Sequence, residues 1–117
     1  MERTLILLKP DALQRGLAGA ILTRFEQKGL KIVGLRLMHM SQELAAKHYE
    51  AHKERPFYRG LVRFMTSAPI VAVAIEGIGA IKICRAMMGA TFGADAAAGT
   101  IRGDFGVSRS YNLIHGS

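Results

Sequence analysis

The 117-residue sequence has one cysteine, no tryptophan, three prolines and no long apolar run. A single cysteine cannot form an internal disulfide, which excludes the class of small domains stapled by disulfides. The longest apolar run, residues 69–75, is far shorter than the ~20 residues that a membrane-spanning helix needs. No small-residue cleavage site follows the apolar residues near the N-terminus, so we expect no secretory signal, no membrane association and a cytoplasmic protein.

Basic residues outnumber acidic ones by 16 to 9, which gives a formal net charge of +7. This excess indicates an anionic partner, and a nucleic acid, a phosphate ligand or an acidic protein would each satisfy it. Lys and Arg are scattered from Arg3 to Arg109 and form no run, which argues against a basic tail. With 50% hydrophobic and 21% charged residues, the composition is that of one ordinary globular domain.

Apolar periodicity divides the chain into alternating strand-like and helix-like segments. We expect strands at 4–8, 30–37, 70–75 and 112–115, helices at 17–28, 41–55, 57–65 and 81–88, and a long ordered loop at 90–111. A shift of phase across Gly34 predicts a β-bulge. This order predicts an α+β fold, an antiparallel ferredoxin-like sandwich with a helical insertion between its second and third strands.

Two pairs of glycines partly match the glycine spacing of the Walker A loop and of the dinucleotide-binding fingerprint. Leu35 and Lys82 occupy positions where those motifs require lysine and glycine, so we interpret the glycines as turn and bulge residues. His48 and His52 have the spacing of zinc ligands on a helix, but no third ligand is signalled, and we expect a solvated helix face. Cys84 lies on an apolar stripe and is expected to be a small core residue.

The C-terminal stretch concentrates polar residues in a glycine-rich segment without helical period: Thr100, Arg102, Asp104, Arg109, Asn112, His115 and Ser117. A polar surface loop would explain them. Arg102, however, is framed by Ile101 and Phe105, which indicates a loop packed against the domain. Lys9 ends an apolar strand, where a free surface lysine is unexpected. Fixed cations around a neutral histidine are what phosphoryl transfer requires, since it needs charge neutralisation and a nucleophile.

Segments that cover nearly the whole chain resemble the nucleoside diphosphate kinase family, in the order that the family has them. They are TLILLKPD at 4–11, His48-Tyr49 with Arg55-Pro56-Phe57, MMGAT at 87–91, GTIRGDF at 99–105 and NLIHGS at 112–117. The last of these is similar to the family's active-site segment. The family fold is ferredoxin-like with an inserted helical hairpin, which agrees with the order of elements expected above.

The resemblance implies a ping-pong transfer of the γ-phosphoryl group from a nucleoside triphosphate to a nucleoside diphosphate, with Mg²⁺. His115 would be the nucleophile and form a phosphohistidine. Lys9, Arg85, Arg102 and Thr91 would grip the phosphates, Tyr49 would position the phosphoryl group, Phe57 would stack on the base, and Asn112 would hydrogen-bond the sugar region. Stacking accepts any base. The surrounding cations should keep His115 neutral, and Mg²⁺ would be held by phosphates and water, with no metal-ligating side chains.

The resemblance also implies a homo-oligomer, a tetramer or hexamer, with the loop at 90–111 at the subunit contact. The family normally carries prolines in this loop, where this sequence has Gly93 and Ala98. Residues 109–111, Arg-Ser-Tyr, replace a glycine-containing approach to Asn112. The sequence ends at Ser117, before a downstream Glu that orients the family's histidine. We therefore expect a single domain over residues 1–117 that lacks the C-terminal helix and tail.

Two alternatives remain beside the kinase. A ferredoxin-like sheet with a pI of about 10.1 also suits an RNA-binding module. Residues 102–107 faintly resemble such a module's motif, but Asp104 stands where a stacking aromatic belongs. The other alternative is a catalytically weak or silent truncated subunit.

Overall fold

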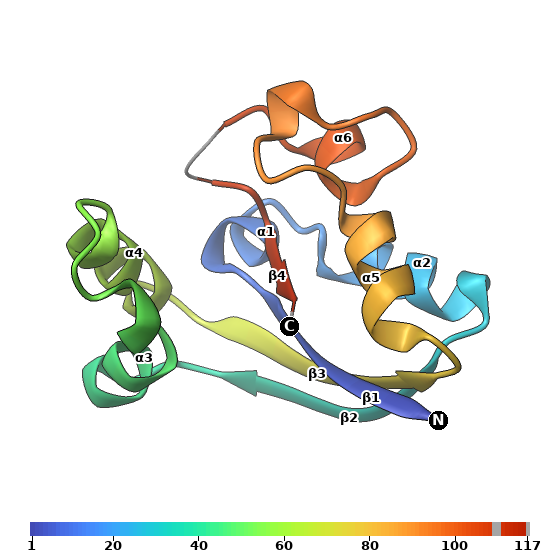
Figure 1. Ribbon diagram of the computed structural model, residues 1–117, viewed down its shortest axis with the longest axis horizontal. Coiled ribbons are helices and arrows are strands. Elements are labelled where there is room, and N and C mark those ends of the chain that lie inside the picture. Colours follow the sequence, from blue (N-terminus) through green and yellow to red (C-terminus); the bar gives the residue numbers. More distant parts are fainter. Residues whose placement is uncertain (109–110, 117) are drawn as a thin grey trace.

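The computed structural model describes residues 1–108 and 111–116, and Figure 1 shows their arrangement. The elements follow in the order β1 (Glu2–Leu8), α1 (Pro10–Gln14), α2 (Ala18–Lys28), β2 (Lys31–Met38), α3 (Gln42–His48), η1 (Glu50–His52), α4 (Tyr58–Thr66), β3 (Ile70–Gly77), α5 (Ala80–Met88), η2 (Gly93–Asp95), α6 (Ile101–Phe105) and β4 (Ile114–Gly116).

The four strands form one antiparallel sheet in the order β2-β3-β1-β4. This order confirms the predicted ferredoxin-like fold. The helices α3 and α4 are inserted between β2 and β3 and lie beyond one end of the sheet, whereas α1, α2 and α5 lie over one of its faces (Figure 1). The register between β2 and β3 shifts between Ile32 and Gly34, which confirms the bulge.

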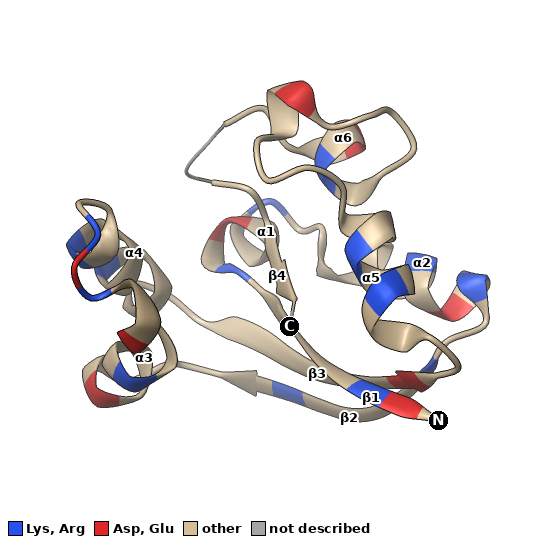
Figure 2. Ribbon diagram, viewed as in Figure 1, with Lys and Arg blue, Asp and Glu red and all other residues tan. Residues whose placement is uncertain are grey.

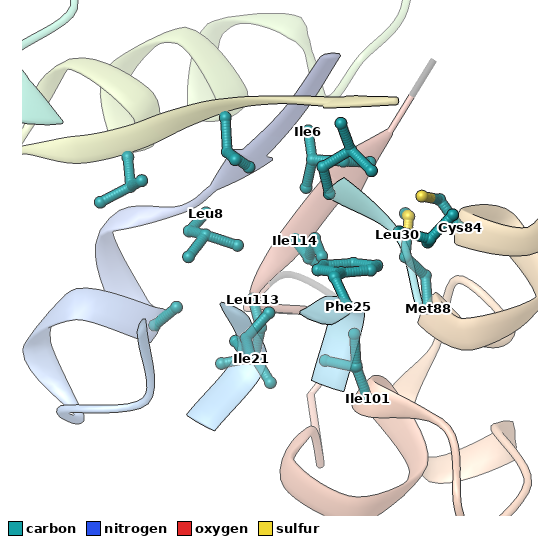
Figure 3. Close-up of a cluster of buried hydrophobic side chains, with 14 of the residues drawn as sticks. Ile6, Leu8, Ile21, Phe25, Leu30, Cys84, Met88, Ile101, Leu113 and Ile114 are labelled. Atoms are coloured by element: carbon teal, nitrogen blue, oxygen red, sulfur yellow. The ribbon is translucent and has the colours of Figure 1, made fainter. Parts of the chain in front are cut away.

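Strand β1 separates two clusters of buried apolar side chains. Ile6 and Leu8 point into the larger cluster, which packs α2 and α5 on the sheet (Figure 3). Leu7 points the other way, into a smaller cluster with Met65 and Ile70 under the α3–α4 insertion. Successive side chains of a strand face opposite sides, so β1 is covered on both, and the end of this strand is a rigid place to attach a site.

Several helix boundaries follow from local signals that the sequence displays. Gly29, which directly follows the helix expected over 17–28, ends α2 in the left-handed conformation with φ 101°. Ser41 begins α3, where its hydroxyl accepts a hydrogen bond of 3.1 Å from the amide of Leu44. Cys84 is buried, as expected for a core residue. Among the described residues, the structure contains no helix with the length and apolar character needed to cross a membrane.

Other boundaries differ from the expectation. The helix expected over 41–55 ends at His48 and is followed by the single turn η1. Ile81 is exposed, and Ala80 takes its place on the buried stripe of α5. The segment 90–111 contains η2 and α6, and α6 begins because the Thr100 hydroxyl accepts a 3.0 Å hydrogen bond from the amide of Gly103. The last strand starts at Ile114 rather than at residue 112.

Candidate active site

His115 lies in the middle of β4, opposite Leu7 of β1, and is partly buried. Burial is the largest single cause that lowers the pKa of its imidazole, electrostatic interactions with Lys9, His48, Arg102 and Arg85 follow in that order, and together they bring it to about 4. The ring is therefore neutral at pH 7 and keeps a lone pair for nucleophilic attack. This agrees with the predicted neutral state, to which burial contributes beside the cations.

Lys9 stands at the junction of β1 and α1, where it is only 7% exposed. Its Nζ donates a hydrogen bond of 2.7 Å to Oδ1 of Asn112, and its backbone amide donates to the carbonyl of Leu113 at 2.8 Å. Burial and the charge of Arg102 lower the pKa of Lys9 to about 8, against the opposing effect of Asp11. Lys9 is thus a fixed and poorly hydrated cation beside the segment that leads to His115.

Asp11 is a buried site residue that the sequence did not reveal. Its Oδ2 accepts a hydrogen bond of 3.1 Å from the amide of Leu113, and its Oδ1 has no hydrogen-bond partner among the described residues. Leu113 has a φ of 72°, in the left-handed region. The sequence analysis included Asp11 only as the last residue of the segment at 4–11, because its partner, Leu113, lies 102 residues away along the chain.

Arg102 is a second buried cation, held by α6. Its Nε, Nη1 and Nη2 donate hydrogen bonds to the carbonyls of Asn112, Gly89 and Ile114 at 3.3, 3.1 and 2.7 Å. A guanidinium has five N–H donors, so two remain after these three bonds. Arg85 of α5 is exposed and donates to the carbonyl of Gly116 at 3.2 Å. Both arginines therefore flank β4 on the side of α5 and α6.

The α3–α4 insertion brings Tyr49 and His48 to His115. The Tyr49 ring lies 5.9 Å from the His115 ring, and its hydroxyl is buried without a hydrogen-bond partner among the described residues. Burial raises the pKa of Tyr49 to about 12, so the hydroxyl remains a donor. The His48 ring lies 5.4 Å from the His115 ring. His48 is exposed, as predicted, but it also borders the site, which helical spacing alone could not indicate.

His48 and His52 do not act as a pair. His52 lies in η1 with its ring 5.6 Å from that of Phe57, away from His115. No group of three histidine, cysteine or acidic side chains able to hold a metal ion occurs within residues 1–108 and 111–116.

A cleft of about 720 Å³ opens beside Lys9 and Asn112. Its walls are Lys9, Pro56, Phe57, Gly60, Leu61, Phe64, Thr91, Phe92, Tyr111 and Asn112. Phe57 is 53% exposed, so one face of its ring is free to stack. Asn112 joins the cleft walls, because its Nδ2 donates to the carbonyl of Thr91 at 2.9 Å while its Oδ1 accepts from Lys9.

The site thus has an aromatic cleft and a cationic end that meet at Lys9 and Asn112. Of the predicted residues, Phe57, Thr91, Lys9 and Asn112 line the cleft, whereas His115, Tyr49, Arg85 and Arg102 lie outside its walls. The sequence missed Phe64, whose ring lies 5.0 Å from that of Tyr111. Arg109, Ser110 and Ser117 fall outside the described residues. Lys and Arg are spread over many elements (Figure 2), so the site's charge comes from single residues of separate elements.

A neutral histidine among fixed cations, next to a cleft that accepts a flat ring, defines a phosphotransferase that acts on nucleotides. Comparisons with known proteins agree. The family model described as nucleoside diphosphate kinase matches residues 2–117. The chain is 58% identical to a nucleoside diphosphate kinase of Gloeobacter violaceus, covering 100% of this chain and 78% of that protein. It is 56% identical to one of Thermus thermophilus, covering 100% and 85%.

Solved structures give the same result. A halophilic nucleoside diphosphate kinase from Halobacterium salinarum, in complex with CDP, superposes with a TM-score of 0.98 at 53% identity over 99% of this chain and 76% of that one. A family member from Babesia bovis superposes with a TM-score of 0.96 at 48% identity over 100% and 79%. The chain therefore belongs to the nucleoside diphosphate kinase family, and its enzyme class is nucleoside-diphosphate kinase.

Proposed function

We propose that this chain transfers the γ-phosphoryl group of a nucleoside triphosphate to a nucleoside diphosphate through a phosphohistidine on His115. The observation that carries this mechanism is the imidazole of His115, which is held neutral by burial and by the surrounding cations. A neutral ring nitrogen offers a lone pair at pH 7, whereas an imidazolium offers none.

The reaction consists of two half-reactions. A ring nitrogen of His115 attacks the γ-phosphorus, a nitrogen–phosphorus bond forms, and the bond from phosphorus to the β,γ-bridging oxygen breaks. The nucleoside diphosphate leaves with that electron pair on its terminal oxygen. A terminal oxygen of the second diphosphate then attacks the same phosphorus, and the pair of the nitrogen–phosphorus bond returns to His115. The overall exchange is close to isoenergetic, because one β,γ-phosphoanhydride bond breaks in the donor and one of the same kind forms in the product.

The cations and donors around His115 support this assignment. Lys9, Arg85 and Arg102 supply positive charge where the phosphates lie, and the free N–H groups of Arg102 remain available for phosphate oxygens. The unpartnered hydroxyl of Tyr49 can donate to the transferred group. Thr91 lies on the cleft wall, as Lys9 and Phe57 do, and would bind the phosphates.

The cleft residues bind the nucleoside. Phe57 offers a half-exposed ring for stacking, which accepts any base because every base has a π-face. The amide of Asn112 keeps one N–H after its bond to Thr91, and this donor faces the sugar region in our proposal.

Members of this family generally use Mg²⁺. The donor set of this site fits an ion that arrives with the nucleotide, since the carboxylate described above, Asp11, uses Oδ2 to hold the amide of Leu113. Mg²⁺ is held well by phosphate oxygens and water, and it would supply neutralisation of phosphate charge. The side chains described above then need only bind and orient the phosphates.

We also propose a cytoplasmic homo-oligomer, a tetramer or hexamer, built from the single domain of residues 1–117. Edge strand β2 supports self-association, because Leu35 and Leu37 are exposed on it at 58% and 68%. Light scattering of the purified chain over a concentration series tests this assembly, and a monomer at every concentration would contradict it.

The intact mass of the purified chain, measured before and after mixing with Mg-ATP and no acceptor, tests the mechanism. We expect a gain of one phosphoryl group that disappears on addition of a diphosphate or in mild acid. The variant His115→Asn should show no gain, while His39→Asn, outside the site, should behave as the wild type. A folded wild-type chain that binds nucleotide without gaining mass would overturn the phosphohistidine mechanism.

A further inference from the structure

His48 is the one neighbour of the His115 ring to which the mechanism above gives no role, among the groups identified around that ring. It is the last residue of α3, and its ring lies 5.4 Å from that of His115 at an interplanar angle of 78°. The same ring lies 4.6 Å from Tyr49. A phosphoryl group on His115 extends outward from the ring by two further bonds, so its oxygens can reach across this short separation.

We propose that His48 takes up a proton when His115 becomes phosphorylated, and that the resulting imidazolium binds the phosphoryl oxygens until the group is passed on. The inference rests on the phosphohistidine mechanism proposed above. It adds a residue that is neutral in the free enzyme and cationic only in the phosphoenzyme.

The charge balance around His115 gives the reason. Before phosphorylation, the His115 ring beside His48 is neutral and lies among the cations Lys9, Arg85 and Arg102, so it does not attract a cation at residue 48. Burial also lowers the pKa of His48 below its usual value, which favours the neutral ring. After transfer, the His115 ring keeps the proton on its other nitrogen, and the phosphoryl oxygens carry about two negative charges. Ring and phosphoryl group together thus bring about one net negative charge to the site. An opposite charge within about 4–6 Å raises the pKa of an imidazole by roughly 1–3 units.

The other groups that face His48 do not supply this proton switch. Tyr49 precedes η1 and is held protonated by burial, and His52 of η1 contacts Phe57 instead. On α4, which packs against α3, Arg59 and Arg63 line a groove with Gln42 and Ala46 of α3. Within residues 1–108 and 111–116, the ion pairs are Arg3–Glu76 and Arg24–Asp104, and neither involves His48.

The step balances. The β,γ-bridging bond of the triphosphate breaks as the nitrogen–phosphorus bond of His115 forms, the other ring nitrogen of His115 keeps its proton, and the proton that reaches His48 comes from solvent. When the acceptor diphosphate takes the phosphoryl group, the negative charge leaves with it and His48 returns the proton to solvent. A lysine at this position would stay charged in both states and would lack this alternation.

Histidine-labelled enzyme titrated by NMR, as the free chain and as the phosphoenzyme made with Mg-ATP, tests the proposal. We expect the pKa of His48 to rise by about 1–3 units on phosphorylation, and that of His39 to stay constant. The variants His48→Asn and His39→Asn assign the two resonances. An unmoved His48 in a phosphoenzyme that has formed overturns this inference alone, whereas failure of the phosphoenzyme to form overturns the proposed function and this inference with it.

The equilibrium between ATP and phosphoenzyme provides a second readout that a merely structural role would not move. His48 has its higher pKa in the phosphoenzyme and its lower pKa in the free enzyme. As the pH falls from the first value to the second, the wild-type equilibrium constant for phosphoenzyme formation should rise, relative to that of His48→Asn, by up to tenfold per pH unit. The proton chemistry of the nucleotides cancels in this ratio. The ratio of the wild-type constant to that of His39→Asn should not change with pH. If the ratio for His48→Asn does not change with pH either, the proposal is contradicted.

Discussion

The carboxylate of Asp11 holds the backbone of Leu113, with 3.1 Å between Oδ2 and the amide nitrogen. Leu113 adopts a φ of 72°, a conformation that costs a residue with a side chain of order 1 kcal/mol or more. His115 follows two residues later. A buried acceptor at the start of α1 thus fixes an unfavourable backbone conformation just ahead of the nucleophile.

The variant Asp11→Ala tests this relationship. It leaves the amide of Leu113 buried without its acceptor, so we expect a loss of about 1–3 kcal/mol in the free energy of unfolding. The rate of phosphoenzyme formation should fall about tenfold or more, because the approach to His115 relaxes. Urea unfolding and single-turnover kinetics measure the two effects, with the exposed Asp95→Ala as control. Wild-type behaviour of Asp11→Ala would show that Leu113 is held by other contacts.

Stacking on Phe57 should determine how strongly the enzyme binds its nucleotide. Base–aromatic stacking contributes about 1–3 kcal/mol, so Phe57→Ala should raise the nucleotide KM roughly 5- to 150-fold. The phosphoenzyme should still form at saturating ATP, since His115 and the cations remain. The equally apolar but remote Ile78→Ala, 82% exposed, is the matched control. A lowered kcat with an unchanged KM would place Phe57 in the chemical step instead.

The pKa of His115 predicts an acid-sensitive fold. The folded value of about 4 lies below the unfolded value of about 6.5, so between these values the unfolded chain binds more protons. The titration of His115 therefore does not change the free energy of unfolding above pH 6.5, and it lowers this free energy as the pH falls towards 4. After allowance for solvent screening at this partly buried ring, acidification from pH 7 to 4.5 should destabilise the wild type by about 1–2 kcal/mol more than His115→Asn. Denaturant unfolding at both pH values measures the difference, and equal losses would contradict it.

The loop before β4 is packed too tightly at Gly93 to accept a side chain. A Cβ built there lies 2.4 Å from the carbonyl carbon of Gly106. We expect Gly93→Ala to lower the free energy of unfolding by about 1–3 kcal/mol. Gly19→Ala, in α2 with no atom within 4 Å of the added Cβ, should instead stabilise the protein by about 0.5–1 kcal/mol. Thermal unfolding compares the two variants, and effects of the same sign would exclude a packing origin.

The sequence allowed most elements of the fold to be predicted, because their signals are local. Gly29, Ser41 and the phase shift at Gly34 mark a helix end, a helix start and a bulge through the chemistry of a few neighbouring residues. Helix α6 was missed because it has five residues and depends on the Thr100 cap and on packing within the loop. A periodicity argument needs several turns, and this helix offers little more than one.

The site could be predicted only in part. Lys9, Asn112 and His115 follow from motifs that the resemblance supplied, and the structure brings all three together at the sheet edge. Asp11 and His48 were assigned no role, since each meets its partner across most of the chain. A carboxylate that follows a proline is ordinary in a sequence, and so is a histidine that ends a helix. Neither indicates a function until the fold shows what it contacts. Tertiary contact, rather than residue type, identifies them.

In the part of the chain that the structure describes, strand β4 pairs only with β1, and it follows the other three strands of the sheet along the chain. During synthesis on a ribosome, β1, β2 and β3 can assemble while the nucleophile is still inside the exit tunnel, because chains fold from the N-terminal side as they emerge. The nascent protein would then carry Lys9 at the end of a formed strand before any group able to receive a phosphoryl group exists, and the bonds of Lys9 to Asn112 and Leu113 would form as β4 docks. Activity would begin abruptly, at the moment when β4 docks on an already formed edge.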